Sequence, residues 1–281
     1  MQRVLSSHLW VNHRLNVGWL NRVQQAGIDG VEIFLARQHL DYRNKSQVVE
    51  LGHWFRDAKL KLHSIHLPMY TDEYWGQSGP NAVINITETV KSKRIAVVDE
   101  VKRAIEVAEY MPCRYAVQHL GVSGQEFDEK RIDAAFSSLE ELMIFARHRD
   151  VEILLENIPN QLSSAERLMY FVGITHLPLN FCLDLGHAHL NEGVADAFDI
   201  LKERIRSTHV HDNDGTADAH LFPLVAEGGT IDWKQAMKLL RSRDGQYPLL
   251  LELKEPPDMD NPLERAVEVF DRLEEIRHDG E

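Results

Sequence analysis

VEILLEN, residues 151–157, is a short apolar run that ends in the carboxylate of Glu156 and an asparagine. An amphipathic segment follows at residues 164–171, and a second apolar run, residues 180–184, ends in the carboxylate of Asp184. Short apolar runs separated by an amphipathic helix are typical of parallel strands joined by right-handed crossovers. We therefore predict a strand–helix–strand unit here, with one carboxylate at the carboxyl end of each strand.

The same alternation extends over the whole chain. Strands are predicted at residues 4–9, 30–34, 61–66, 115–119, 152–156, 180–184, 207–211 and 249–253, and the clearest helices at residues 92–110, 129–148, 164–171, 233–240 and 263–276. Such a set either closes into a (β/α)8 barrel or stays open as a doubly wound sheet. No glycine-rich nucleotide signature follows the first strand. This favours an α/β fold with one domain, a (β/α)8 TIM barrel over residues 1–281.

The composition and the sequence pattern disfavour nucleic acid as a partner, a membrane span and secretion. Hydrophobic residues make up 43% of the chain and charged residues 27%, which is ordinary for a globular protein. The net charge of −13 disfavours nucleic acid as a partner, because nonspecific binding depends on Lys and Arg. No apolar run reaches the roughly 18 residues of a membrane span, the first residues lack a signal-peptide pattern, and Cys113 and Cys182 form no disulfide framework. We expect a cytoplasmic protein without membrane contact, compatible with an oligomer.

Active sites of parallel barrels lie at the carboxyl ends of the strands, so these positions are candidates for chemistry. They and the segments just beyond carry a set of potential metal ligands: His66, His119, Glu156, Asp184, His187, His209, Asp218, His220 and Glu252. Burying a carboxylate is costly without a cation, and a divalent ion satisfies several carboxylates and imidazoles together. Each residue alone is compatible with a structural role, but their recurrence at consecutive strands favours a metal site. Glu32 is either a salt-bridge partner or a neighbour of the ligands, and His8 is expected outside the site.

A long irregular segment, residues 68–90, follows the third predicted strand and contains Tyr70, Tyr74 and Trp75. A loop at this end of a barrel lies near the active site, and we predict that at least one of these aromatic side chains covers the metal pocket. The alternative is an insertion that packs on the barrel rim. The basic residues just beyond, Lys91, Lys93 and Arg94, either contact a substrate phosphate or form a solvated helix start.

Three motifs in the last third of the chain carry a family resemblance. They are HVHDNDG at residues 209–215, DAH at residues 218–220 and EGGTIDW at residues 227–233. With the strand ends, they resemble the xylose isomerase-like TIM barrel superfamily, which contains sugar isomerases, sugar epimerases and endonuclease IV. The resemblance implies that Glu156, Asp184, His209 and Glu252 hold one ion, as in the ketose epimerases, and that His187 contacts the substrate. Endonuclease IV has a three-zinc cluster, and the matching additional ligands are His66, His119, His187, Asp218 and His220.

Two reactions fit this set of ligands. In the first, one ion supports isomerisation or epimerisation of a small sugar or sugar phosphate, and Glu156 and Glu252 exchange a proton through a metal-bound enediolate. In the second, three zinc ions and an activated water hydrolyse a phosphoester. The acidic composition and the aromatic loop favour the isomerase or epimerase, which is the function we predict from the sequence, whereas the additional ligand positions favour the hydrolase as the alternative. A barrel that binds carbohydrate or metal without turnover is a third hypothesis. Histidine-rich ligation favours Zn²⁺ or Mn²⁺ over Mg²⁺. The two reactions correspond to between one and three ions per chain.

Overall fold

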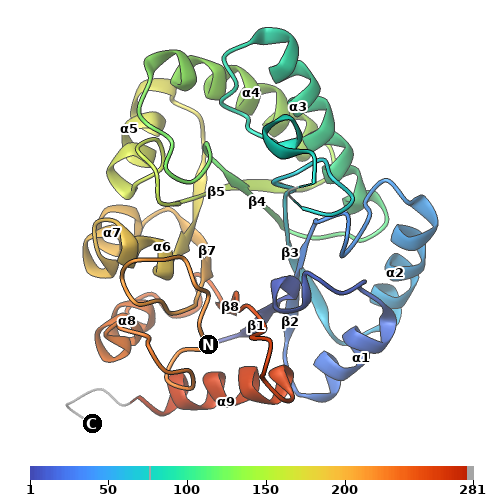
Figure 1. Ribbon diagram of the computed structural model, residues 1–281, viewed down its shortest axis with the longest axis vertical. Helices are drawn as coiled ribbons and strands as arrows, with labels where there is room; N and C mark the ends of the chain where they lie inside the picture. The colour runs from blue at the N-terminus through green and yellow to red at the C-terminus, as the bar shows by residue number, and fades with distance from the viewer. Residues whose placement is uncertain (76, 277–281) are drawn as a thin grey trace.

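Within residues 1–75 and 77–276, which the computed structural model describes, eight parallel strands form one sheet in the order β7-β6-β5-β4-β3-β2-β1-β8 (Figure 1). The strands are β1 (Arg3–Ser6), β2 (Gly30–Phe34), β3 (Lys61–His66), β4 (Tyr115–His119), β5 (Glu152–Glu156), β6 (Asn180–Asp184), β7 (Ile205–His209) and β8 (Leu249–Leu251). Just beyond β7, Val210 forms a parallel bridge with Leu251 and donates its amide to the carbonyl of Leu250 at 2.8 Å. The sheet is therefore a nearly closed, single-domain (β/α)8 barrel, as the sequence predicts.

Helices surround the strands on the outside of the barrel (Figure 1). In the described part of the chain they are α1 (Val17–Gln25), α2 (Lys45–Asp57), α3 (Lys91–Ile105), α4 (Glu129–Arg147), α5 (Ala165–Thr175), α6 (Leu185–Leu190), α7 (Val194–Leu201), α8 (Trp233–Arg241) and α9 (Pro262–Glu275). Short 3-10 helices are η1 (Ser7–Trp10), η2 (Gly79–Ala82) and η3 (Glu106–Glu109). Among the described residues, no helix is long and apolar enough to cross a membrane.

Side-chain alternation along the strands separates the core from the site. Ile153 and Leu155 of β5 belong to the large apolar cluster shared with the helices, whereas Leu154 packs inside the barrel with Tyr115, Val117 and Cys182. Successive side chains of a strand point to opposite faces, so Glu156 lies on the same face as Leu154. The carboxyl end of β5 therefore places Glu156 on the inner face of the barrel, beyond this apolar cluster.

The predicted bounds of β2 to β6 agree with the structure, but three other strands differ. β7 begins at Ile205 rather than at residue 207, because Ile205 is buried and pairs with Phe181 while Arg206, one residue on, points to the other face. β1 ends at Ser6, whose hydroxyl accepts the amide of His8 and starts η1. β8 ends at Leu251 instead of residue 253. β1, β7 and β8 all end earlier than predicted, so residues 7–9, 210–211 and 252–253 lie beyond the strands at the mouth of the barrel.

Candidate metal centre

Strand pairing brings the predicted ligands together at one end of the barrel. His119 is the register partner of Glu156, and Asp184 is the register partner of His209. Within the described residues, potential ligand atoms gather in three groups, each with its atoms within 4.8 Å of one another. All nine residues that the sequence singles out belong to these groups, which we name the first, second and third donor groups.

The first donor group consists of His66, His119 and Glu156, at the ends of β3, β4 and β5. The Nε2 atom of His66 lies 3.3 Å from Oε2 of Glu156, and the Nε2 atom of His119 lies 3.0 Å from the same oxygen. The two Nε2 atoms are 3.2 Å apart. Two imidazoles and a carboxylate oxygen therefore face one point, and Glu156 is fully buried.

The second donor group consists of Glu156, Asp184, His209 and Glu252, all buried. Nδ1 of His209 lies 3.1 Å from Glu156, 3.3 Å from Glu252 and 3.7 Å from Asp184. Glu156 belongs to both the first and the second group, and its two oxygens face different histidines. A bridging carboxylate of this kind can hold two ions side by side.

The third donor group consists of His187, His211, Asp218 and His220. Nε2 of His187 is 3.1 Å from one oxygen of Asp218, and Nε2 of His220 is 3.3 Å from the other. His187 lies on α6, whose N-cap is Asp184, and the Asp184 carboxylate accepts the amide of His187 at 2.7 Å. His211 also contacts Asp184, at 3.1 Å. Asp184 thus connects the second and third groups.

The ring nitrogens that face away from the donor groups determine which nitrogens carry protons. Nδ1 of His66, His187 and His220 lies 2.9, 3.0 and 2.9 Å from the backbone carbonyls of Leu67, Asn157 and Glu252, respectively. A carbonyl only accepts, so Nδ1 donates and, in the neutral ring, Nε2 is a bare lone pair. These lone pairs face carboxylate oxygens, an arrangement that either a proton or a metal ion between them would satisfy. Ligating histidines usually donate their other ring nitrogen in this way, and the donor set therefore fits divalent metal ions.

His209 has the opposite orientation and a different partner. Its Nε2 atom lies 3.1 Å from Oε1 of Glu32, which leaves Nδ1 for the second donor group. The hydroxyls of Ser6 and Ser64 donate to the two oxygens of Glu32 at 3.1 and 2.8 Å. Glu32 is fully buried on β2 and is therefore a neighbour of the ligands, one of the two alternatives that the sequence leaves open.

In the metal-free protein, protons on the histidines take the place of a metal ion between the imidazoles and the carboxylates. The pKa values of these groups are shifted accordingly. Burial alone would lower the pKa of His220, but Asp218 and Glu252 raise it to about 9. Burial alone would raise the pKa of Glu32, yet His209 lowers it to about 2. Burial alone would lower the pKa of His209, but Cys182 and the surrounding carboxylates raise it well above its ordinary value. A metal ion that binds at neutral pH must therefore displace protons from the site.

Two histidines outside the ligand set predicted from the sequence lie in or beside the third donor group. His211 follows β7 directly, and its ring stacks on that of His220 at 3.9 Å between centroids. His8 lies in η1, with its ring centroid 4.6 Å from that of His220 and 5.0 Å from that of Phe34. His8 belongs to none of the donor groups, in agreement with its exclusion from the ligand set, although η1 brings its ring beside His220. The HVH motif at residues 209–211, which begins at the last residue of β7, was the available signal for His211.

The loop after β3 covers one side of the centre. Tyr70 forms an antiparallel bridge with Val83 and lines a pocket that also contains His119, His187 and Asp218. Trp75 packs edge-on against Phe34, which in turn stacks on His66. Tyr74 is 58% exposed and is not among the described residues that line this pocket. Of the three aromatic side chains, Tyr70 lines the pocket beside the donor groups, and Gly76 of this loop lies outside the described residues.

The basic residues after the loop do not take part in the pocket. Lys91, Lys93 and Arg94 begin α3, and Arg94 donates to the backbone carbonyl of Glu88 at 3.0 Å. None of them is among the described residues that line the pocket. Of the two alternatives from the sequence, the structure therefore favours a solvated helix start.

The comparisons with known proteins identify the family. Residues 20–276 match the family model described as xylose isomerase-like TIM barrel, and the chain belongs to this family. An uncharacterized protein of Methanocaldococcus jannaschii, MJ1614, is 27% identical over 79% of this chain and 88% of its own length. A D-tagatose 3-epimerase-like protein superposes with a TM-score of 0.75 at 21% identity, covering 98% of this chain and 97% of that protein. The IOLI protein with a bound zinc atom superposes with a TM-score of 0.73 at 17% identity, covering 98% and 96%.

Proposed function

We propose that this protein is a multinuclear, metal-dependent hydrolase of small phosphoric esters. The observation that carries the proposal is that three donor groups adjoin one another, with Glu156 common to the first two and Asp184 in contact with members of the third. A one-ion isomerase requires the second group alone. The imidazoles of His66 and His119 and the whole third group would then have no ion to bind, although Nε2 of His66, His187 and His220 faces carboxylate oxygens.

Ions bound in the three groups would supply Lewis acidity toward a phosphate ester and lower the pKa of a water molecule. The protein's own part is to hold donors at fixed positions. Glu156 spans two groups, Asp184 orients the amide of His187, and backbone carbonyls fix the rings of His66, His187 and His220. Such a rigid arrangement stabilises developing charge without reorganisation during the reaction.

The substrate that fits is a small molecule. The pocket beside the first and third donor groups has a volume of about 220 Å³ and is partly covered by Tyr70. The net charge of −13 disfavours an extended polyanion such as duplex nucleic acid. A phosphorylated sugar or another small phosphoester therefore suits the site better than a polymer.

Isomerisation or epimerisation of a small sugar is the second candidate function. The observation that favours it is that Glu156 and Glu252 both approach Nδ1 of His209, at 3.1 and 3.3 Å. Two carboxylates at one centre can remove a proton from the carbon next to a carbonyl and return it. The enclosed pocket, which suits an uncharged sugar, agrees with this hypothesis as well.

The two functions separate in a paired assay on the zinc- or manganese-loaded protein. Hydrolysis of p-nitrophenyl phosphate and bis(p-nitrophenyl) phosphate is measured by absorbance, and proton exchange on ketose sugars in D₂O by NMR. We expect phosphoester hydrolysis that His220→Ala reduces about a hundredfold, whereas His53→Ala, on the exposed face of α2, leaves it unchanged. Deuterium incorporation into a ketose without phosphoester hydrolysis would contradict the proposal and establish the isomerase instead.

A further inference from the structure

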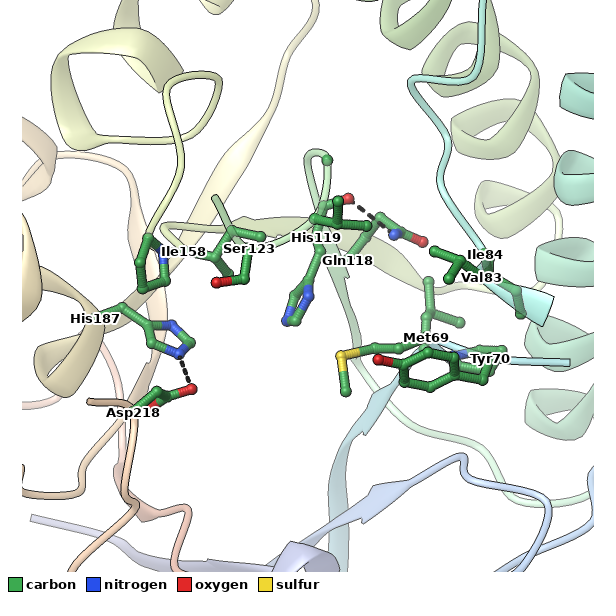
Figure 2. A pocket seen from close by; sticks show the side chains of 15 residues that line it. Met69, Tyr70, Val83, Ile84, Gln118, His119, Ser123, Ile158, His187 and Asp218 are labelled. Atoms are coloured by element: carbon green, nitrogen blue, oxygen red, sulfur yellow. Dashed lines mark hydrogen bonds and ion pairs between the residues drawn. The ribbon is translucent and has the colours of Figure 1, made fainter. Parts of the chain in front are cut away.

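Next to the donor groups lies the pocket that also contains Tyr70, here called the side pocket. Figure 2 shows His119 pointing into this space from one side and His187 with Asp218 from the other, with Met69 and Tyr70 along a further wall. Its lining comprises Leu67, Pro68, Met69, Tyr70, Val83, Ile84, Gln118, His119, Gly121, Val122, Ser123, Ile158, Pro159, His187 and Asp218. A substrate whose reacting group sits at the metal centre would extend its remaining part into the side pocket.

The side pocket offers no cation to a second anionic group. Of the fifteen described residues that line it, none is lysine or arginine. The single carboxylate is that of Asp218, which faces His187 and His220 in the third donor group. Polar groups away from the donor groups come from uncharged side chains, Tyr70, Gln118 and Ser123. A phosphate or carboxylate far from the metal centre would therefore lose water without gaining an ion pair.

The walls opposite the donor groups are mostly apolar. Leu67 and Ile84 of the long loop after β3 and Ile158 after β5 are buried, and Met69 and Val83 are half-buried on the long loop. The bridge between Tyr70 and Val83 fixes the two arms of this loop against each other. Apolar side chains held in place before binding favour a rigid ligand with an apolar face, such as an aromatic ring or the C–H face of a sugar ring.

We propose that the part of the substrate beyond the reacting group is uncharged and presents an apolar face to Met69, Val83 and Ile84. This substrate class rests on the proposed function, because the phosphate of the ester is taken to occupy the donor groups. Monoesters of an aromatic alcohol or of a sugar without further phosphates belong to the class. Sugar bisphosphates and phosphoesters that carry a carboxylate do not.

Two non-hydrolysable phosphonates test this inference on the zinc-loaded protein. Phenylphosphonate and 4-phosphonobenzoate share the phosphonate and the ring, and differ by one carboxylate at the far end of the ring. We expect isothermal titration calorimetry to give a dissociation constant at least tenfold lower for phenylphosphonate, because the carboxylate of its analogue is desolvated without a partner. Methylphosphonate, which lacks the ring, should bind roughly tenfold more weakly than phenylphosphonate, since it buries no apolar face.

Two variants test whether the preference for phenylphosphonate arises in the side pocket. Val83→Lys places a cation at the side pocket and should remove or reverse the preference for phenylphosphonate. Ile95→Lys introduces the same side chain at an exposed position of α3 and should leave the preference unchanged. Equal affinity of the wild-type protein for the two aromatic phosphonates, or binding of neither, overturns the inference whether or not the variants fold.

The results of the phosphonate titrations can be distinguished from a failure of the proposed hydrolase function. The phosphonates are not hydrolysed, so their binding does not depend on turnover. A protein that prefers phenylphosphonate but cleaves no phosphoester refutes the hydrolase alone. A protein that cleaves phosphoesters but binds both aromatic phosphonates equally refutes the substrate class alone.

Discussion

Replacing Glu32 by Gln tests whether the carboxylate behind His209 controls metal binding. Glu32 does not belong to any donor group, yet its Oε1 atom lies 3.1 Å from Nε2 of His209, and both side chains are fully buried. The serine hydroxyls at 2.8 and 3.1 Å hold the carboxylate in place. Because Glu32 accepts a hydrogen bond from Nε2 of His209, the Nδ1 lone pair stays directed at the second donor group. The same hydrogen bond raises the basicity of Nδ1.

Glu32→Gln retains the size of the side chain and an oxygen that can accept from His209, but it removes the charge. A hydrogen bond to a charged group contributes about 1.5–3 kcal/mol and a neutral one about 1 kcal/mol, so the expected loss is roughly 0.5–2 kcal/mol. This corresponds to roughly 2- to 30-fold weaker binding of one ion. Substitutions at such supporting partners typically weaken metal binding 10- to 100-fold, and we expect a loss on the order of tenfold.

Competition with a chromophoric chelator measures zinc affinity directly, without reference to activity. One of the binding steps should weaken about tenfold in Glu32→Gln, while Glu50→Gln, on the exposed surface of α2, should titrate like the wild type. A thermal melt of both metal-free variants controls for misfolding. If Glu32→Gln folds normally and binds zinc with unchanged affinity, then Glu32 does not position His209 and the argument from ring-nitrogen partners is refuted.

Three further predictions concern pH, the third donor group and the loop. The pKa of His220 in the metal-free protein is about 9 against 6.5 when unfolded, so its stabilising contribution is full below pH 6.5 and is lost as pH rises through 9. The melting temperature of the chelator-treated protein should therefore fall from pH 6.5 to 9. That of the metal-loaded protein should rise over the same range, because fewer protons then compete with the metal ions for the ligands. Parallel trends for the two forms would argue against metal binding. His211→Ala should reduce zinc by up to one ion per chain in plasma emission spectrometry, relative to His53→Ala, and full occupancy would remove His211 from the third group. Tyr70→Ala should raise KM for a small phosphoester about tenfold with little change in kcat, and an unchanged KM would show that Tyr70 does not contact the substrate.

Much of the barrel follows from the sequence because strand and helix periodicities are local. β5 and β6 are uninterrupted apolar runs, and their terminal carboxylates identify the mouth of the barrel without knowledge of the tertiary structure. β7 is harder to delimit, because Arg206 interrupts the apolar pattern although its neighbours Ile205 and Ser207 are buried. The predicted ends of β1 and β8 are too long for a different reason, because apolar residues continue beyond both strands although the ladder stops at Ser6 and Leu251.

The parts of the site that the sequence did not give depend on contacts between distant segments. His8 reaches His220 only because η1 ends β1 early, and a short 3-10 turn has no strong sequence signal. Glu32 could be assigned only once Nε2 of His209 was located, 177 positions away in the chain. Tyr70 and Tyr74 are equivalent by composition, and the pairing of Tyr70 with Val83 determines which of them faces the pocket.

The number of ions per chain is the most direct test of a three-group metal centre. The wild-type protein, loaded with zinc and freed of excess metal by gel filtration, is measured by inductively coupled plasma spectrometry together with its absolute protein concentration. We predict three zinc ions per chain, one for each donor group around Glu156, Asp184 and Asp218. A stoichiometry of one, with the ion lost on replacement of Asp184 but kept on replacement of Asp218, would contradict the multinuclear centre and leave the second donor group alone as the metal site.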